Sequence, residues 1–214
     1  MSAPQPLSAA KAHNGPPSRL ERRRTRRIDD ILRVAAERLA IQGYAATNLD
    51  EIGEALDLSK ASLYHYFPNK EELVVACLDR VGKDTVQRLS AVADRALGPR
   101  ERLYEAIRTQ VLILIRDQPA GASLYLNDLG LPQSARERLH TFVAQHDAIF
   151  KSIIDDGIRQ GELRARDPVI ARLLMHGAMN FIPSWFRQAN RLPAERFADI
   201  VADTVLQLFV GERS

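Results

Sequence analysis

A short run of polar and aromatic side chains, SKASLYHY from Ser59 to Tyr66, holds the groups best suited to contact a DNA duplex. Lys60 can donate hydrogen bonds to guanine O6 or N7, and Ser62 can donate or accept. Ala61 is small enough to let the backbone come close, and its methyl group suits contact with a thymine methyl. Three further side chains end in groups suited to phosphate oxygens: Tyr64, His65 and Tyr66. The run therefore predicts a surface that can read a duplex.

Positive charge is concentrated upstream of this run. The chain has a formal net charge of +3. Residues 11–27 hold seven basic side chains and one acidic one, whereas residues 28–80 hold five basic and ten acidic ones. Two interpretations of the basic segment stay open: a solvated tail, or an arm that lies along a phosphate backbone or in a minor groove. Arg26 and Arg27 are candidate DNA contacts in this segment.

Two short helices must position these groups. Asn48, followed three residues later by Glu51, is a capping-box pattern that predicts a helix from about residue 49 to 56, with Thr47 as the alternative cap. Ser59 is a favourable N-cap for a second short helix, which ends before Pro68. This spacing predicts a helix-turn-helix.

The turn between these helices contains Asp57 and Leu58. Glycine is usual where a turn needs a positive φ, but aspartate enters that region more readily than most residues. Asp57 is therefore an acceptable substitute. The predicted small core of the motif consists of Ile52, Ala55, Leu58, Leu63 and Phe67.

Helices are predicted over the rest of the chain as well. Apolar residues with a 3.6-residue period predict a helix from Ile28 to about Gly43, and Asn69 with Glu72 predicts a long helix to about residue 97. Lys70 begins this long helix, where free backbone N–H groups favour a phosphate. Further helices are predicted at about 100–117, 120–129, 133–160, 167–189 and 194–210, and no alternating strand pattern competes with them. The sequence predicts an all-α protein with an N-terminal three-helix helix-turn-helix domain.

The segment from Arg27 to Arg80 resembles the DNA-binding domain of TetR-family regulators. The resemblance rests on the first helix, Gly43–Tyr44, Thr47, Ile52 and the block SKASLYHYFPNKEEL, while Asp57, Leu58 and Ala61 depart from the usual pattern. It implies a dimeric repressor that a small-molecule effector releases from a palindromic site in double-stranded DNA. It also implies DNA contacts at Thr47, Ser59, Lys60, Ala61, Ser62, Tyr64, His65, Tyr66 and Lys70, to which we add Asn48. The expected organisation is a disordered lead (1–20), a DNA-binding domain (21–68) and a C-terminal helical bundle for ligand binding and dimerisation (69–214).

Two late helices have apolar stripes that suit a dimer surface. The first stripe comprises Ile170, Leu173, Leu174, Gly177, Ala178, Phe181, Ile182 and Trp185, and the second Phe197, Ile200, Val201, Thr204, Val205, Leu208 and Phe209. Other apolar residues fall off these stripes, so each helix needs more than one burial partner. A wholly intramolecular core is the alternative; TetR-like proteins usually dimerise through their last two helices, which favours a homodimer.

A largely apolar ligand cavity is expected between the C-terminal helices. The candidate ligand-binding residues are Tyr104, Tyr125, Phe142, Phe150, Phe181, Trp185 and Arg187, although ordinary core packing is the alternative for each aromatic. Gly177, Asn180 and the Trp185–Phe186–Arg187 cluster resemble TetR-like regulators that respond to fatty acyl or steroid-derived coenzyme A thioesters. This resemblance implies an acyl-CoA-type effector.

No pattern indicates an enzyme, a metal centre or a cofactor. His140 and His146 fall on different helix faces without a completing ligand, and no nucleophile motif or phosphate loop is found. One cysteine, Cys77, and no apolar run near about 20 residues suit a cytoplasmic protein that does not cross a membrane. The competing functions are an activator or nucleoid-like binder without a ligand, and an enzyme that carries a helical hairpin by chance.

Overall fold

The computed structural model describes residues 18–126, 130–188 and 192–210. These residues are helical apart from short connections and one isolated bridge between Arg164 and Val210, which confirms the all-α prediction. The helices are α1 (Arg19–Ala46), α2 (Leu49–Glu54), α3 (Lys60–Tyr66), α4 (Lys70–Ala93), α5 (Pro99–Leu112), which continues as a π-helical turn (Ile113–Asp117), α6 (Pro119–Leu126), α7 (Gln133–Arg159), α8 (Pro168–Gln188) and α9 (Ala194–Leu206), followed by a 3₁₀ turn (Gln207–Phe209).

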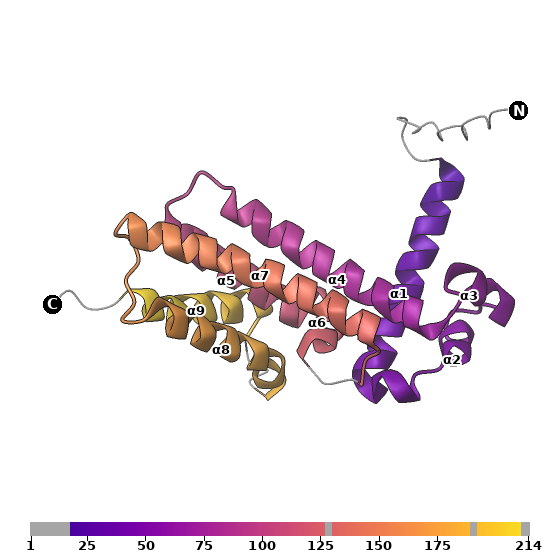
Figure 1. Ribbon diagram of the computed structural model, residues 1–214. Coiled ribbons are helices and arrows are strands. Elements are labelled where there is room, and N and C mark those ends of the chain that lie inside the picture. Colours follow the sequence, from indigo (N-terminus) through magenta and orange to yellow (C-terminus); the bar gives the residue numbers. More distant parts are fainter. Residues whose placement is uncertain (1–17, 127–129, 189–191, 211–214) are drawn as a thin grey trace, which may run out of the picture.

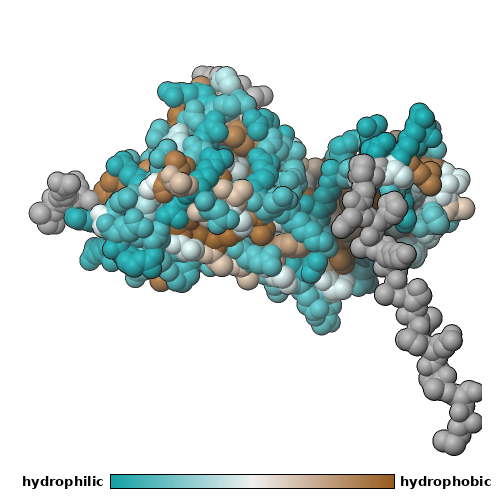
Figure 2. All heavy atoms as spheres, turned by 90° about the horizontal axis from the view of Figure 1, so that it is seen from above, coloured by the Kyte–Doolittle hydropathy of each residue, from teal (hydrophilic) through white to brown (hydrophobic). Residues whose placement is uncertain are grey.

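The molecule has a small head and a longer helical bundle (Figure 1). The head holds α2, α3 and the end of α1, while α4 and α7 run side by side away from it. Hydrophilic residues cover most of the face in Figure 2, where a constriction separates the two parts. Among the residues that the structure describes, no helix is both long and apolar enough to cross a membrane.

Helix α1 begins earlier than the apolar periodicity predicted. Ser18 caps it: the Ser18 hydroxyl accepts from the Glu21 backbone N–H at 3.2 Å, and the Ser18 N–H donates to the Glu21 carboxylate at 2.6 Å. The basic segment is therefore helical from Arg19 onward, which corrects the end of the predicted lead; residues 1–17 of that lead lie outside the described residues. At the other end, Gly43 has φ 73° and breaks the helix where the sequence predicted.

The helix-turn-helix packs around fewer residues than predicted. Ile52, Leu63 and Phe67 are buried and Leu58 is half-buried, but Ala55 is exposed. Ala55 lies outside the core because α2 ends at Glu54. The turn is closed by Gly53, whose carbonyl accepts a hydrogen bond from the Leu58 N–H at 2.9 Å. The Asn48 side chain does cap α2, but it accepts from the Asp50 N–H at 3.0 Å, so the predicted pairing with Glu51 was wrong.

The turn residue Asp57 has φ 52°, as the sequence predicted. Replacing Asp57 with alanine is expected to lower the free energy of unfolding by about 1 kcal/mol. Both residues have a Cβ, which disfavours the left-handed region, but alanine lacks the polar side chain with which aspartate compensates. Replacing it with glycine should leave stability unchanged or slightly higher. Urea unfolding of the two variants tests this, and an alanine variant as stable as the glycine variant would contradict it.

Helix α4 belongs to both parts of the molecule. Its first turns (Leu73, Val74, Cys77, Leu78) pack into the head core with α1, and its last turns (Leu89, Val92) pack into the bundle core. The head core also takes Leu124 from α6. Packing therefore crosses the predicted domain boundary at residue 68, since the long helix that starts there supplies apolar side chains to both cores.

Candidate DNA interface and ligand cavity

Helix α3 presents its polar side chains outward. Its single buried residue, Leu63, anchors it to the head core. The Ser59 hydroxyl caps the helix by accepting from the Ser62 N–H at 3.2 Å, and the two serine hydroxyls lie 2.9 Å apart. Among the predicted contacts in and before α3, Ser59, Lys60, Ala61, Tyr64 and His65 are exposed, while Ser62 and Tyr66 are half-buried. The arrangement leaves the first turn of α3 free to enter a groove.

Lys60 is held by an ion pair within the head. Its Nζ lies 2.8 Å from Asp50 Oδ2 and 5.7 Å from the centre of the Tyr64 ring. The hydrogen bond to Asp50 raises the pKa of Lys60. The ammonium group is therefore charged and paired with Asp50 beside α3, and contact with a base requires it to exchange Asp50 for a base acceptor.

Two of the predicted DNA contacts are engaged inside the protein. Thr47 is 3% exposed, and its hydroxyl donates to the Gly43 carbonyl at 2.7 Å. The Lys70 Nζ donates to the carbonyls of Tyr44, Ala45 and Thr47 at 2.8, 3.2 and 3.1 Å and lies 4.4 Å from the centre of the Tyr44 ring. Both side chains satisfy free carbonyls at the end of α1. Thr47 and Lys70 line an open hollow in the head together with Asn48 and Tyr64. The hydrogen bonds of Thr47 and Lys70 orient the backbone there.

The basic segment forms a one-sided arginine stripe. Its members follow the i, i+3, i+4, i+7, i+8 spacing of one helix face and are all exposed: Arg19, Arg22, Arg23, Arg26 and Arg27. The stripe extends over about 12 Å at 1.5 Å per residue. In Figure 1 this part of α1 stands clear of the rest of the head. The predicted arm is thus a rigid helix with a cationic face.

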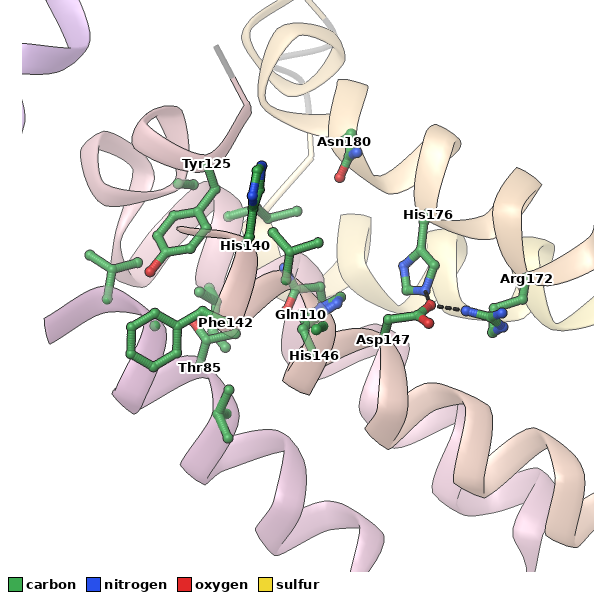
Figure 3. A pocket seen from close by; sticks show the side chains of 18 of the residues that line it. Thr85, Gln110, Tyr125, His140, Phe142, His146, Asp147, Arg172, His176 and Asn180 are labelled. Carbon is green, nitrogen blue, oxygen red and sulfur yellow. Dashed lines mark hydrogen bonds and ion pairs between the residues drawn. The ribbon is translucent and has the colours of Figure 1, made fainter. Parts of the chain in front are cut away.

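A cavity of about 610 Å³ opens between α4, α6, α7, α8 and the end of α5 (Figure 3). Its apolar walls include Val81, Val86, Ile113, Leu114, Ala122 and Val143. Of the predicted ligand-binding residues, only Tyr125 and Phe142 line it among those whose side chains are described. Gly82 lets α4 approach both, because a Cβ there would lie 2.4 Å from Phe142 and 2.5 Å from the Tyr125 hydroxyl.

The other predicted ligand residues lie elsewhere. Phe150 is buried behind the wall, with ring centres 5.0 Å from His146 and 5.4 Å from His176, and Tyr104 packs against the bundle core. Phe181 and Trp185 are exposed on α8, whereas Ile182 of the same stripe is buried. The Arg187 side chain lies outside the described residues. Residue type does not reveal how a helix is rotated about its axis, so the sequence could not show which aromatic side chains face the cavity.

Polar side chains that are not among the predicted ligand-binding residues line the same cavity. Arg172 and Asp147 form an ion pair, and His176 Nε2 lies 3.1 Å from Asp147 Oδ1 without the angles of a hydrogen bond. Burial, with a smaller effect of the neighbouring His176, lowers the pKa of His146 to about 3. Burial, with a smaller effect of Arg172, lowers the pKa of His176 to about 4. Both imidazoles are therefore neutral at pH 7. The spacing of Arg172 and His176, four residues apart on one helix, was the available signal.

Comparison with known proteins decides the family. The family model described as "Bacterial regulatory proteins, tetR family" matches residues 31–77. The model described as "Tetracyclin repressor-like, C-terminal domain" matches residues 96–209, more than half of the chain. The chain belongs to the TetR family. It is a DNA-binding transcriptional regulator and not an enzyme.

Several TetR-family relatives cover most of its length. The fatty acid metabolism regulator of Bacillus subtilis is 22% identical over 188 residues, 85% of this chain and 92% of the relative. The transcriptional repressor KstR2 of Mycolicibacterium smegmatis is 27% identical over 147 residues, 64% and 68% of the two chains. The structure of AibR, solved with isovaleryl coenzyme A and operator DNA, is 27% identical with a TM-score of 0.72, covering 85% and 97%.

This TetR-family chain has an exposed apolar face on its last two helices. Most residues of the two predicted stripes are exposed: Ile170, Leu173, Leu174, Gly177, Phe181, Trp185, Ile200, Thr204 and Leu208. Ile182, Val205 and Phe209 from the same stripes are buried, as are the off-stripe residues Ala171, Met175, Met179, Ala198, Ala202 and Leu206. Helix α8 therefore buries one face in its own bundle and leaves a second apolar face that no other described residue covers; Ile200 of α9 and Leu208 in the turn after it are exposed as well.

Proposed function

We propose that the protein is a ligand-responsive repressor, which binds a palindromic operator as a homodimer and is released by a small effector with an apolar body. The observation that carries this proposal is a single helix, α4, that joins the head core to a half-open cavity of about 610 Å³. That volume lies within the usual range for small-molecule sites. The AibR complex supports acyl-CoA thioesters as the first effectors to test. A genomic target implies a cytoplasmic location.

The proposed DNA contacts divide by chemistry. Lys60, Ala61 and Ser62 read base edges from the first turn of α3. Tyr64, His65 and Tyr66 contact phosphates, as do Arg26 and Arg27 with the rest of the arginine stripe. Thr47 and Lys70 orient the end of α1, while Asn48 and Ser59 act through their helix caps.

The exposed face of α8 and α9 is the proposed dimer interface. Contiguous exposed apolar patches mark interaction surfaces. A two-fold axis through that face makes the surface self-complementary and sets the distance between two α3 helices. Their separation then has to match one helical turn of DNA, about 34 Å. This geometry accounts for a palindromic operator.

Helix α4 is the proposed route of coupling. Leu73–Leu78 pack against α1 in the head, and Val81–Val86 line the cavity one to two turns later. An effector that fits one placement of α4 better than the other shifts the population toward that placement. The α3 helices then no longer match the operator spacing, and the dimer dissociates from DNA.

Selection of bound DNA from a random pool, repeated with candidate effectors, tests the proposal. We expect enrichment of one short palindrome and its release by an effector that binds the cavity. Uniform enrichment would indicate a nucleoid-like binder. An effector that strengthens binding and raises transcription would indicate an activator.

The arginine stripe should act without regard to sequence. Replacing Arg19, Arg23 and Arg26 together with glutamine is expected to weaken operator and random DNA alike, and to reduce the slope of log affinity against log salt by up to about 0.9 for each phosphate that is no longer neutralised. Glutamine at Arg164, Arg166 and Arg196, which belong to the bundle, is the matched control and should leave the slope unchanged. If both triple variants had the same salt-dependence slope, the arginine stripe would not contact DNA phosphates.

A further inference from the structure

We infer that the effector carries an uncharged hydroxyl group on its apolar body, and that Gln110 and His146 bind this hydroxyl inside the cavity. The inference rests on the proposed function, because it assigns the chemistry of the ligand in the same cavity. It follows from three features of the lining: its charge balance, its unpaired polar atoms and its apolar surroundings.

The cavity offers no free charge among its described lining residues. Asp147 and Arg172 are the charged side chains of the lining, and they pair with each other. His146 and His176 are neutral because burial lowers the pKa of each far below 7. A carboxylate or phosphate that entered the cavity would lose its hydration without gaining an unpaired cation, which is unfavourable. The part of the effector inside the cavity is therefore uncharged.

Among the described residues, three neutral side chains of the lining have an unpaired buried atom; His176 Nε2 lies 3.1 Å from Asp147 Oδ1, whereas Gln110 and His146 have no such charged neighbour at their unpaired atoms. Gln110 is 9% exposed, and its Oε1 has no hydrogen-bond partner. The His146 Nε2 is likewise shielded from solvent and unpaired. Both belong to the wall of this cavity, Gln110 from α5 and His146 from α7 (Figure 3). Buried polar groups are paired in nearly all proteins, so each atom lacks a partner that a polar group of a ligand in the cavity could supply.

The chemistry of the two groups selects a hydroxyl. A glutamine amide presents one acceptor and two donors on one plane, and a neutral imidazole presents one of each. A hydroxyl donates one hydrogen bond and accepts two, so it can bind both at once. A carboxylate only accepts, and an alkyl chain does neither. Six apolar side chains also line the cavity and suit a hydrocarbon body (Val86, Ile113, Leu114, Ala122, Phe142, Val143), while Thr85, His140 and Asn180 are further polar residues of the lining.

Calorimetric titration of the full chain with matched ligands tests this. The probes are decanoyl, 3-hydroxydecanoyl and 10-hydroxydecanoyl chains, each as the coenzyme A thioester and as the neutral N-acetylcysteamine thioester. For one hydroxyl position we expect at least tenfold tighter binding than for the plain chain. Equal affinity for the two thioester forms would mean that the protein contacts only the acyl chain, inside the cavity. Tighter binding of the coenzyme A form would mean that coenzyme A makes further contacts outside the cavity. Both outcomes agree with the inference.

Variants assign the preference to its residues. Gln110→Met keeps the side-chain length and should reduce the preference for the hydroxylated chain to within twofold, by weakening that ligand alone; His146→Leu should act in the same direction. Val86→Ala, which trims an apolar wall, should weaken both chains alike. A wild-type protein without hydroxyl preference, or a preference that survives in Gln110→Met, overturns the inference even if the chains release DNA. If no probe binds or releases DNA, the apolar-effector proposal itself fails.

Discussion

Replacing Phe181 with glutamate is expected to convert the proposed dimer into a folded monomer and to weaken operator binding more than 100-fold. Phe181 is 65% exposed in the single chain and lies within the apolar face of α8. In a dimer joined through this face the carboxylate would be buried without a partner, which destabilises by about 3–5 kcal/mol. Three kcal/mol corresponds to more than about 100-fold in affinity. Sedimentation and gel-shift titration measure the two effects.

Ile41→Glu is the control for this substitution. Ile41 is also a large apolar residue, 84% exposed, but it lies on α1 in the head. The same change of chemistry there should leave the protein dimeric. A Phe181→Glu variant that remains a dimer would show that α8 is not part of the interface. A monomeric variant with full operator affinity would show that operator binding does not need two α3 helices.

Replacing Leu63 with alanine is expected to abolish operator binding while the dimer and its ligand cavity remain intact. Leu63 is fully buried and is the single buried residue of α3. A seven-residue helix is not stable in isolation and depends on such packing. Truncating a buried leucine costs about 2–5 kcal/mol. Hydrogen exchange should therefore accelerate in α2 and α3 and stay slow in the bundle.

Leu89→Ala provides the matched comparison. Leu89 is equally buried, but it packs in the bundle core. Its truncation should lower the stability of the bundle and leave exchange in α3 unchanged. If both variants lost operator affinity and exchange protection to the same extent, the two cores would unfold as one unit and the head would have no separate stability.

Local patterns predicted the helices well, because a cap or an apolar period acts within one or two turns of chain. Ser59 and Asn69 cap the helices that they were predicted to cap, and Asp57 adopts the positive φ expected of the turn. The early start of α1 was missed although Ser18 and Glu21 form the same S-x-x-E pattern. Of the predicted ligand-binding residues whose side chains are described, only Tyr125 and Phe142 line the cavity, since five helices contribute to it and their rotation follows from packing.

The sequence by itself determined that α3 carries duplex-reading chemistry and that α8 and α9 have two apolar faces each, because both follow from residue type and helical period. Only the tertiary structure decided that Lys70 binds the carbonyls of Tyr44, Ala45 and Thr47, and that Gln110 and His146 line one cavity. Those partners are more than twenty residues apart in the chain. Each residue turns a helix by about 100°, so a small change in helix packing decides which side chain meets which.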